Sequence, residues 1–188
     1  MREARREGYR SRSVYKLAEI AERDRLLKSG ISVVDLGAAP GGWSQYIQRK
    51  FGARVRVVAL DVLPMEPVPG VVFIQGDFRE ATVLAELERA LEDKPLDLVL
   101  SDLSPNISGI DVADQIGSMY LTELALEFAR LRLRPGGTLL VKAFQGEGFD
   151  DFLKNLRQVF EKVAIRKPKA SRPRSRETYL LARGLRPC

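Results

Sequence analysis

From residue 31 onward, apolar segments of strand length alternate with stretches of helical periodicity, and this alternation constrains the fold more than any other feature. The apolar segments are nearly continuous, which is typical of strands buried on both faces of a parallel sheet. The sequence therefore predicts an α/β protein in which helices cover both faces of a mostly parallel sheet. Strands are expected over 31–36, 55–60, 71–74, 96–100, 138–141, 163–165 and 178–182, and helices over 43–50, 81–91, 116–133 and 149–159.

We expect one domain over residues 1–188, because no repeat, low-complexity segment or shift of composition marks a boundary. Residues 1–12 are expected to form a basic arm. The arm leads into a helix that Ser11 or Ser13 caps and that runs to about Arg25.

Positive charge is concentrated in the arm and in a second segment, residues 162–176. The chain has 31 Lys and Arg residues against 25 Asp and Glu, a formal net charge of +6. Pro168 and Pro173 prevent a regular helix in the second segment and hold its cations on an extended loop, which suits a phosphate backbone. Ordinary solvated surface is the alternative interpretation. The candidates for nucleic-acid contact are Arg10, Arg12, Lys167, Lys169, Arg172, Arg174 and Arg176.

The chain has no histidine, and its single cysteine is Cys188. This excludes Ser-His-Asp and Cys-His catalysis, an internal disulfide, and metal sites built from imidazole or several thiolates, so we expect no metal. A general base that acts near neutral pH must then be a Lys, a Tyr or a carboxylate with a shifted pKa. No apolar run approaches the length of a membrane span and no secretion signal is present, so a cytoplasmic protein without a membrane partner is expected.

Glycine, carboxylate or amine groups stand at the carboxyl ends of five expected strands. Open α/β sheets bind their ligands at this edge, so these residues are the candidates for a binding and catalytic site. They are Asp35, Gly37, Gly41 and Trp43 after the first strand, then Asp61, Asp77, Asp102 and Lys142.

The loop after the first strand lacks the glycine spacing of a dinucleotide site, whereas the acid two residues before Gly37, followed by Asp61, indicates a nucleoside-containing cofactor. Gly37 and Gly41 let the backbone approach a ligand, whereas the second glycine of G-x-G-x-x-G is missing and Pro40 lies in the loop. Asp61 can accept hydrogen bonds from both ribose hydroxyls, and Asp77 from an adenine amine. Each carboxylate could instead be an ordinary turn or helix-cap residue.

Lys142 follows an apolar segment that should be a central strand. Burial lowers the pKa of an amine, so a lysine held beside a carboxylate such as Asp102 could serve as the base in a chain without histidine. A lysine that extends from the strand end into solvent is the alternative. Glu177 would reach this site if the last strand is antiparallel, and Lys16, off the apolar face of its helix, is of a kind that is ordinarily solvated.

Five motifs together cover the chain from Arg10 onward. They are Ser13-Val-Tyr-Lys-Leu at 13–17, Asp-Leu-Gly-Ala-Ala-Pro-Gly-Gly-Trp-Ser at 35–44, Leu-Ser-Asp-Leu-Ser-Pro-Asn at 100–106, Leu-Val-Lys at 140–142 and Ser-Arg-Glu-Thr-Tyr at 175–179. In combination they resemble the FtsJ-type S-adenosylmethionine-dependent RNA 2′-O-ribose methyltransferases. The glycine loop alone indicates a methyltransferase, whereas the Lys-Asp-Lys-Glu order indicates ribose methylation.

The resemblance implies a Rossmann-like methyltransferase fold, with a mostly parallel seven-stranded sheet whose last strand is antiparallel. It implies S-adenosylmethionine as cofactor, S-adenosylhomocysteine as product, and methylation of a uridine 2′-O-ribose in large-subunit (23S) ribosomal RNA on the assembled subunit. We expect a monomer, since RNA would cover the basic face. The implied catalytic residues are Lys16, Asp102, Lys142 as proton acceptor and Glu177, and the implied cofactor contacts are Gly41, Trp43, Asp61, Asp77 and Asp102.

Three other functions stay open from the sequence. A ribose methyltransferase for transfer RNA or a messenger cap would use the same four catalytic residues. A cofactor-binding RNA chaperone would keep the glycine loop and the basic loop but would need none of the four. A dinucleotide oxidoreductase is disfavoured by the missing glycine pattern.

Overall fold

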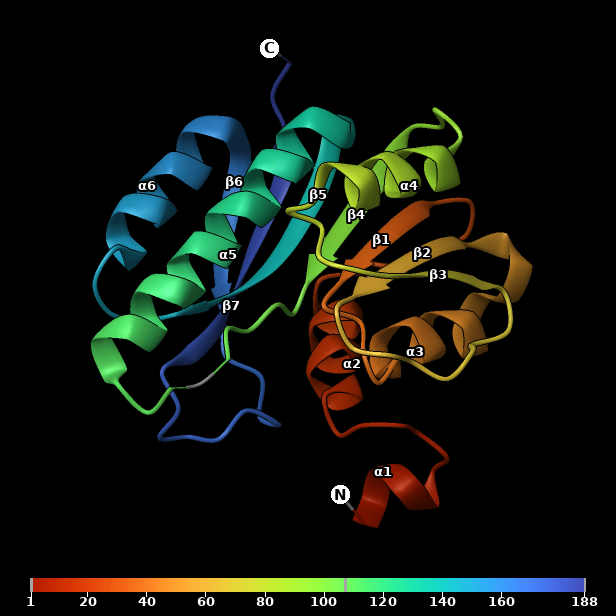
Figure 1. Ribbon diagram of the computed structural model, residues 1–188, viewed down its shortest axis with the longest axis horizontal. Coiled ribbons are helices and arrows are strands. Elements are labelled where there is room, and N and C mark those ends of the chain that lie inside the picture. The colour runs from red at the N-terminus through yellow and green to blue at the C-terminus, as the bar shows by residue number, and fades with distance from the viewer. Residues whose placement is uncertain (1, 107, 188) are drawn as a thin grey trace.

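The computed structural model describes residues 2–106 and 108–187, so Cys188 lies outside the described residues. Its centre is a seven-stranded sheet in the order β3-β2-β1-β4-β5-β7-β6 (Figure 1). β7 pairs antiparallel with both of its neighbours, and the other pairs are parallel. This confirms the predicted α/β fold and the antiparallel last strand. The strands are β1 (Ser32–Leu36), β2 (Arg56–Asp61), β3 (Val71–Gln75), β4 (Leu96–Ser101), β5 (Leu133–Phe144), β6 (Phe160–Arg166) and β7 (Glu177–Leu185).

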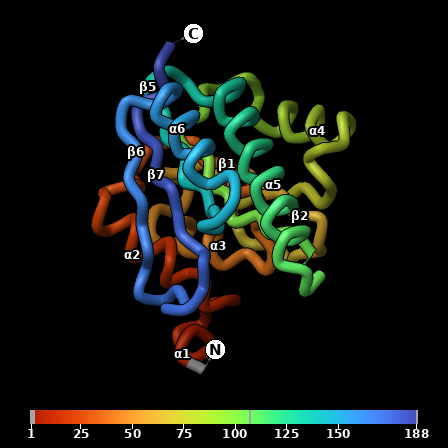
Figure 2. Tube along the Cα trace, turned by 90° about the vertical axis from the view of Figure 1, so that its left-hand side faces the viewer, coloured from red at the N-terminus to blue at the C-terminus, as the bar shows by residue number. Residues whose placement is uncertain are grey.

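Helices cover both faces of the sheet, and Figure 2 shows α4 and α5 on the opposite side of the strands from α2. One core cluster joins the sheet to α4, α5 and α6, and the second joins it to α2 and α3. Neighbouring side chains in the central strands alternate between the two clusters, as Val33 and Val34 do on β1 and Val57 and Val58 on β2, which the pleat requires. The helices are α1 (Arg2–Arg6), α2 (Val14–Arg23), α3 (Gly42–Phe51), α4 (Ala81–Leu91), α5 (Asp111–Arg132) and α6 (Phe149–Val159), with a short 3₁₀ turn η1 (Gly52–Arg54).

The faces of β5 and β7 decide where the charged side chains lie. On β5, Leu139 and Val141 pack toward α5 and α6, whereas Leu140 packs toward α2 and α3. Lys142 therefore lies on the α2 side, because it stands two residues after Leu140. Its cross-strand partner on β7 is Tyr179, which belongs to the α2 side as well.

The N-terminal segment differs from the expectation in two ways. Ser13 occupies the N-cap position of α2 but makes no capping hydrogen bond, because its hydroxyl lies 2.5 Å from that of Ser11. The expected capping bond was wrong, and α2 ends at Arg23. Residues 2–6 form a helix, and the segment after it is held by Arg49, which donates to the carbonyls of Glu7 at 2.9 Å and Gly8 at 2.6 Å.

The loop formed by the second basic segment is shorter than expected. β6 extends to Arg166 because its residues pair with β7 from Phe160 to Arg166. The basic loop is therefore residues 167–176 and not 162–176. No helix within the described ranges is long and apolar enough to cross a membrane.

Candidate active site

Lys142 lies at the centre of a group of charged side chains, although it is a buried residue of the sheet. Its side chain is 7% exposed, and its Nζ lies 3.3 Å from Asp102 Oδ1. The ammonium also donates to the Asp102 carbonyl at 3.0 Å and to the hydroxyl of Ser104. These acceptors all come from the segment after β4, the strand next to β5, so the amine is bound at the carboxyl edge of the sheet.

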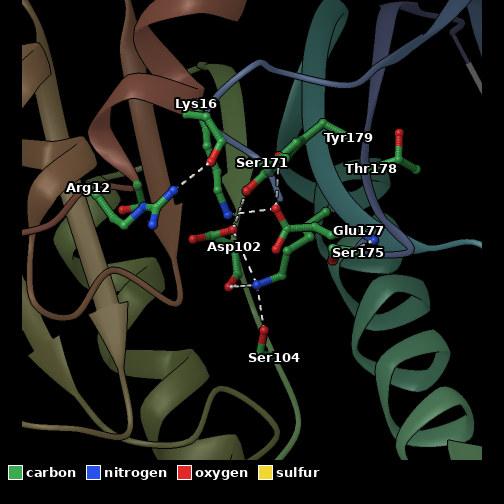
Figure 3. Close-up of polar contacts among 12 residues, drawn as sticks. Arg12, Lys16, Asp102, Ser104, Ser171, Ser175, Glu177, Thr178 and Tyr179 are labelled. Carbon is green, nitrogen blue, oxygen red and sulfur yellow. Dashed lines mark hydrogen bonds and ion pairs between the residues drawn. The ribbon is translucent and has the colours of Figure 1, made fainter. Parts of the chain in front are cut away.

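Lys16 and Glu177 form a second ion pair beside the first (Figure 3). Lys16 Nζ lies 2.6 Å from Glu177 Oε1, and the two side chains are 17% and 13% exposed. Ser171 of the basic loop also donates to Glu177 Oε1, at 3.2 Å. Burial raises the pKa of the Glu177 carboxyl, but the hydrogen bond from Lys16 and the charges of Lys16 and Lys142 outweigh it and leave this pKa below its ordinary value.

Tyr179 lies next to both pairs, since Lys16 Nζ is 6.0 Å from the centre of its ring, and the sequence analysis assigned it no role. Its hydroxyl donates to Asp102 Oδ1 at 2.8 Å, and its ring is fully buried opposite Lys142 in the β5–β7 register. Burial, followed by the charges of Asp102 and Glu177, raises the pKa of the phenol well above its ordinary value, so Tyr179 remains a donor. One sequence signal was present, because a residue two positions after Glu177 on a strand shares its face.

A cavity of about 540 Å³ opens at the carboxyl ends of β1, β2, β3 and β4 and reaches Lys142. Five of the residues singled out from the sequence line it, and Ser104, Arg79 and Tyr120 are lining residues that sequence reasoning missed. The five are Gly37, Asp61, Asp77, Asp102 and Lys142.

Backbone groups and a neighbouring arginine hold the carboxylates of this cavity in place. Asp61 accepts from the amides of Ala39 and Leu63, both at 2.9 Å. Asp77 accepts from Arg79 Nε at 2.8 Å, and this hydrogen bond lowers the pKa of the Asp77 carboxyl. Because each carboxylate oxygen can accept more than one hydrogen bond, Asp61 keeps acceptor capacity for a ligand. Both oxygens of Asp77 already accept from Arg79, through its backbone amide, Nε and Nη2, so a ligand amine would replace one of these hydrogen bonds.

Gly37 is required where the first loop meets the segment after β4. Its φ is +76°, and an added Cβ would lie 2.9 Å from the backbone nitrogen of Leu103. Any side chain at this position would push the two cavity-lining segments apart.

Asp35, Gly41 and Trp43 do not line the cavity. Trp43 is buried, and its indole donates to the Ser13 carbonyl at 2.9 Å, which ties α3 to the start of α2. Gly41 has a φ of +104° at the N-cap of α3. These residues therefore support the glycine loop without lining the cavity.

The Asp35 carboxylate is 1% exposed and lies under the glycine loop. Ser44 donates to Asp35 Oδ2 at 2.7 Å, whereas Oδ1 has no hydrogen-bond partner among the described residues. Burial raises the pKa of Asp35 to about 7, and the hydrogen bond from Ser44 opposes this rise.

The candidates for nucleic-acid contact divide into two groups. Arg10 and Lys167 donate to backbone carbonyls, Arg10 to those of three residues and Lys167 to those of Ser175 and Glu177. Arg12 donates to the Ala170 carbonyl at 3.1 Å, which joins the arm to the basic loop. Lys169, Arg172, Arg174 and Arg176 present exposed side chains on the loop.

Within residues 2–106 and 108–187, no group of three or more His, Cys, Asp or Glu side chains is placed to hold a metal ion.

Residues 9–185 match the family model described as FtsJ-like methyltransferase. The chain belongs to the FtsJ-like methyltransferase family. This FtsJ-like methyltransferase is 60% identical over 186 residues to the ribosomal RNA large subunit methyltransferase E of Nitrosospira multiformis, and the match covers 99% of the chain and 90% of that relative. It is 61% identical to the protein of the same name from Azoarcus sp., with coverages of 97% and 89%.

Solved structures agree with this family. A crystal structure from Plasmodium falciparum, of a protein assigned as a ribosomal RNA methyltransferase, superimposes on the FtsJ-like methyltransferase with a TM-score of 0.84 at 31% identity. The match covers 94% of this chain and 98% of that one.

Replacing Asp35 should change how stability depends on pH. The carboxyl has a pKa of about 7 when folded and about 3.9 when unfolded, so the folded state binds more protons between these values. The free energy of unfolding should therefore fall as pH rises from about 4 to about 7, by on the order of 4 kcal/mol. In Asp35→Asn this component should be absent, which denaturant unfolding at a series of pH values would measure.

Ser44→Ala provides a second test of the same carboxyl group. Removing the hydroxyl that stabilises the charged carboxylate should extend the fall in stability to higher pH. Parallel pH profiles for the unmodified chain and Asp35→Asn would contradict the assignment.

Proposed function

We propose that this FtsJ-like methyltransferase transfers a methyl group from S-adenosylmethionine to the 2′-O-ribose of a uridine in 23S ribosomal RNA, within the assembled large subunit. The observation that carries the proposal is the convergence of Lys16, Asp102, Lys142 and Glu177 beside the cavity. The name of relatives at 58–61% identity, ribosomal RNA large subunit methyltransferase E, supports ribosomal RNA as the substrate. Such a substrate would place the reaction in the cytoplasm.

The cavity suits a nucleoside-containing methyl donor. Asp61 follows β2 and keeps acceptor capacity for two ribose hydroxyls, and Asp77 follows β3, where it can accept from an adenine amine. Gly37 keeps the loop close to the segment that carries Asp102. Asp35, Gly41 and Trp43 would support this loop. When bound, the donor supplies an electrophilic methyl group next to the charged side chains.

The role of the four side chains is to hold a ribose hydroxyl and to remove its proton. We assign proton acceptance to Lys142 Nζ as the neutral amine, after its own extra proton has passed to solvent; Asp102 and Ser104 hold this nitrogen directly, and Tyr179 holds Asp102. Lys16 and Glu177 lie on the side of the basic loop, where they would bind the ribose. In such an in-line displacement the enzyme mainly has to align the ribose hydroxyl with the methyl carbon and to remove the hydroxyl proton.

The basic loop would hold the phosphate backbone next to this site. Its exposed cations are Lys169, Arg172, Arg174 and Arg176, and Ser171 connects the loop to Glu177. Phosphate contacts of this kind set orientation and carry little sequence information.

The direct test is transfer of labelled methyl from S-adenosylmethionine to large ribosomal subunits, protein-free ribosomal RNA, transfer RNA and capped messenger RNA. We expect label on large subunits, recovered as an alkali-resistant dinucleotide, because a 2′-O-methyl group blocks cleavage of the adjacent phosphodiester. Label on a base would overturn ribose methylation, and label on transfer RNA or on a cap alone would overturn the substrate.

Lys142→Ala should abolish transfer without weakening binding of the methyl donor. Loss of a general base lowers a rate by roughly 10²–10⁴-fold, whereas Asp61 and Asp77 remain to hold the nucleoside. Single-turnover transfer and calorimetry with S-adenosylhomocysteine measure the two effects. Lys154→Ala, on the exposed face of α6, should match the unmodified chain in both. If Lys142→Ala kept most of its rate, Lys142 would not be the proton acceptor.

Reversing the charges of Arg172, Arg174 and Arg176 to Glu should weaken RNA binding and flatten its dependence on salt. Each lost phosphate contact lowers the slope of log K against log salt by about 0.7 to 0.9, so a decrease of about 2 to 3 is expected. The matched control reverses three exposed arginines on the outer helices, Arg89, Arg130 and Arg157, and should keep the slope. Equal slopes in the two triple variants would exclude the basic loop from phosphate binding.

A further inference from the structure

Arg10 is bound to two loops that lie at one wall of the cavity. Its Nη1 donates to the carbonyl of Pro40 at 3.3 Å and to that of Glu66, and its Nη2 donates to the carbonyl of Pro67 at 2.6 Å. Pro40 belongs to the glycine loop between β1 and α3, and the other two residues belong to the loop between β2 and β3. One guanidinium therefore joins segments that are 26 residues or more apart in the chain.

The same two loops provide lining residues of the cavity, Gly37 and Ala39 from the first and Asp61, Val62 and Leu63 from the second. The carboxylate of Asp61 joins them on the cavity side, because its oxygens accept from the amides of Ala39 and Leu63. Arg10 joins them a second time, through the carbonyls of residues 40, 66 and 67.

The loops pack tightly at Gly41. A Cβ added there would lie 2.8 Å from Met65 Sδ and 3.2 Å from Arg10 Nη1. Gly41 is thus the position at which the loop after β2 and the Arg10 guanidinium both pack against the glycine loop.

Arg10 is itself fixed by α3. Its backbone amide donates to Gln45 Oε1 at 3.1 Å, and Gln45 Nε2 donates to the Gly8 carbonyl at 3.0 Å. The side chain is therefore held over the loops by an anchored backbone and does not depend on RNA for its position.

We propose that Arg10 is a positioning residue for the methyl-donor cavity and not a phosphate contact: its guanidinium holds residues 62–68 against the glycine loop. The assignment of this cavity to the methyl donor rests on the proposed function. Arginine suits the task because its planar fork donates to several carbonyls at once, whereas a lysine ammonium is a single point charge. Hydrogen bonds from a charged group are among the stronger ones in proteins.

Calorimetry with S-adenosylhomocysteine, without RNA, tests the proposal on Arg10→Ala and Arg10→Lys. Both variants should bind with a dissociation constant about tenfold higher than that of the unmodified chain. Arg54→Ala is the matched control, because the exposed Arg54 also donates to backbone carbonyls, those of Phe51 and Lys50, but to neither cavity loop, and its affinity should be unchanged. The lysine variant keeps the positive charge but loses the planar guanidinium, so it tests the hydrogen-bond geometry of Arg10 separately from its charge. It is informative even if the alanine variant fails to fold.

Two further readouts complete the test. Amide exchange at Leu63 and Val71, whose amides donate to Asp61 Oδ1 and to the Val68 carbonyl, should be faster in both Arg10 variants when it is measured without ligand. The salt slope of RNA binding should stay that of the unmodified chain in Arg10→Ala, as expected of a residue that contacts no phosphate.

Unchanged ligand affinity in Arg10→Lys, or unchanged exchange, would overturn the proposal, and a salt slope lowered by about 0.7 to 0.9 in Arg10→Ala would make Arg10 a phosphate contact. Failure of the unmodified chain to bind the ligand would instead overturn the proposed function, and the exchange measurement would still decide whether Arg10 holds the loops.

Discussion

The antiparallel pairing of β7 with β5 determines where the charged side chains of the site lie. The register sets Tyr179 opposite Lys142 and Glu177 opposite Phe144, so Lys142, Tyr179 and Glu177 share the face of the sheet that α2 covers. A slip of one residue would turn Tyr179 and Glu177 toward α5 and leave Lys142 without its neighbours. The apolar residues that alternate with them, Leu180 and Ala182, bury in the opposite core and hold the register.

Burial of these charges is costly, and the structure offsets the cost with paired groups. Lys142 and Glu177 are almost wholly removed from solvent, and each meets an opposite charge and at least one hydroxyl. Loss of one partner from a buried pair costs about 3–5 kcal/mol, because the remaining charge is left uncompensated. The arrangement therefore favours a function for these residues over a contribution to stability alone.

Much of the fold follows from local patterns, whereas parts of the site depend on contacts between distant segments. The helices over 81–91 and 149–159 were predicted with the bounds that the structure has, because their apolar spacing is regular. β5 begins at Leu133, earlier than expected, because Leu133 pairs with Leu96 of β4; the Pro-Gly-Gly sequence then falls in an irregularity of the register, and pairing resumes at Thr138. Lys16 shows the limit most clearly: from its helix alone it is a solvated lysine, and its partner Glu177 lies 161 residues away.

Charge patterns have the same limit. Arg10 and Lys167 stand in basic segments, so their composition predicts nucleic-acid contact, but both donate to backbone carbonyls. A pattern of cations cannot show which guanidinium or ammonium meets a carbonyl oxygen, because that depends on how the loops pack. For the exposed residues Arg172 and Arg174, contact with nucleic acid stays a prediction.

We propose that Lys142 Nζ takes the proton of a ribose hydroxyl. This proton transfer is tested most directly by a crystal structure of this chain with S-adenosylhomocysteine and an RNA that contains the target uridine. We expect the ribose 2′-oxygen between Lys142 Nζ and the sulfur of the cofactor product, within hydrogen-bond distance of the nitrogen, about 2.6–3.2 Å. A base atom or a phosphate oxygen in that position, with the 2′-oxygen elsewhere, would contradict it.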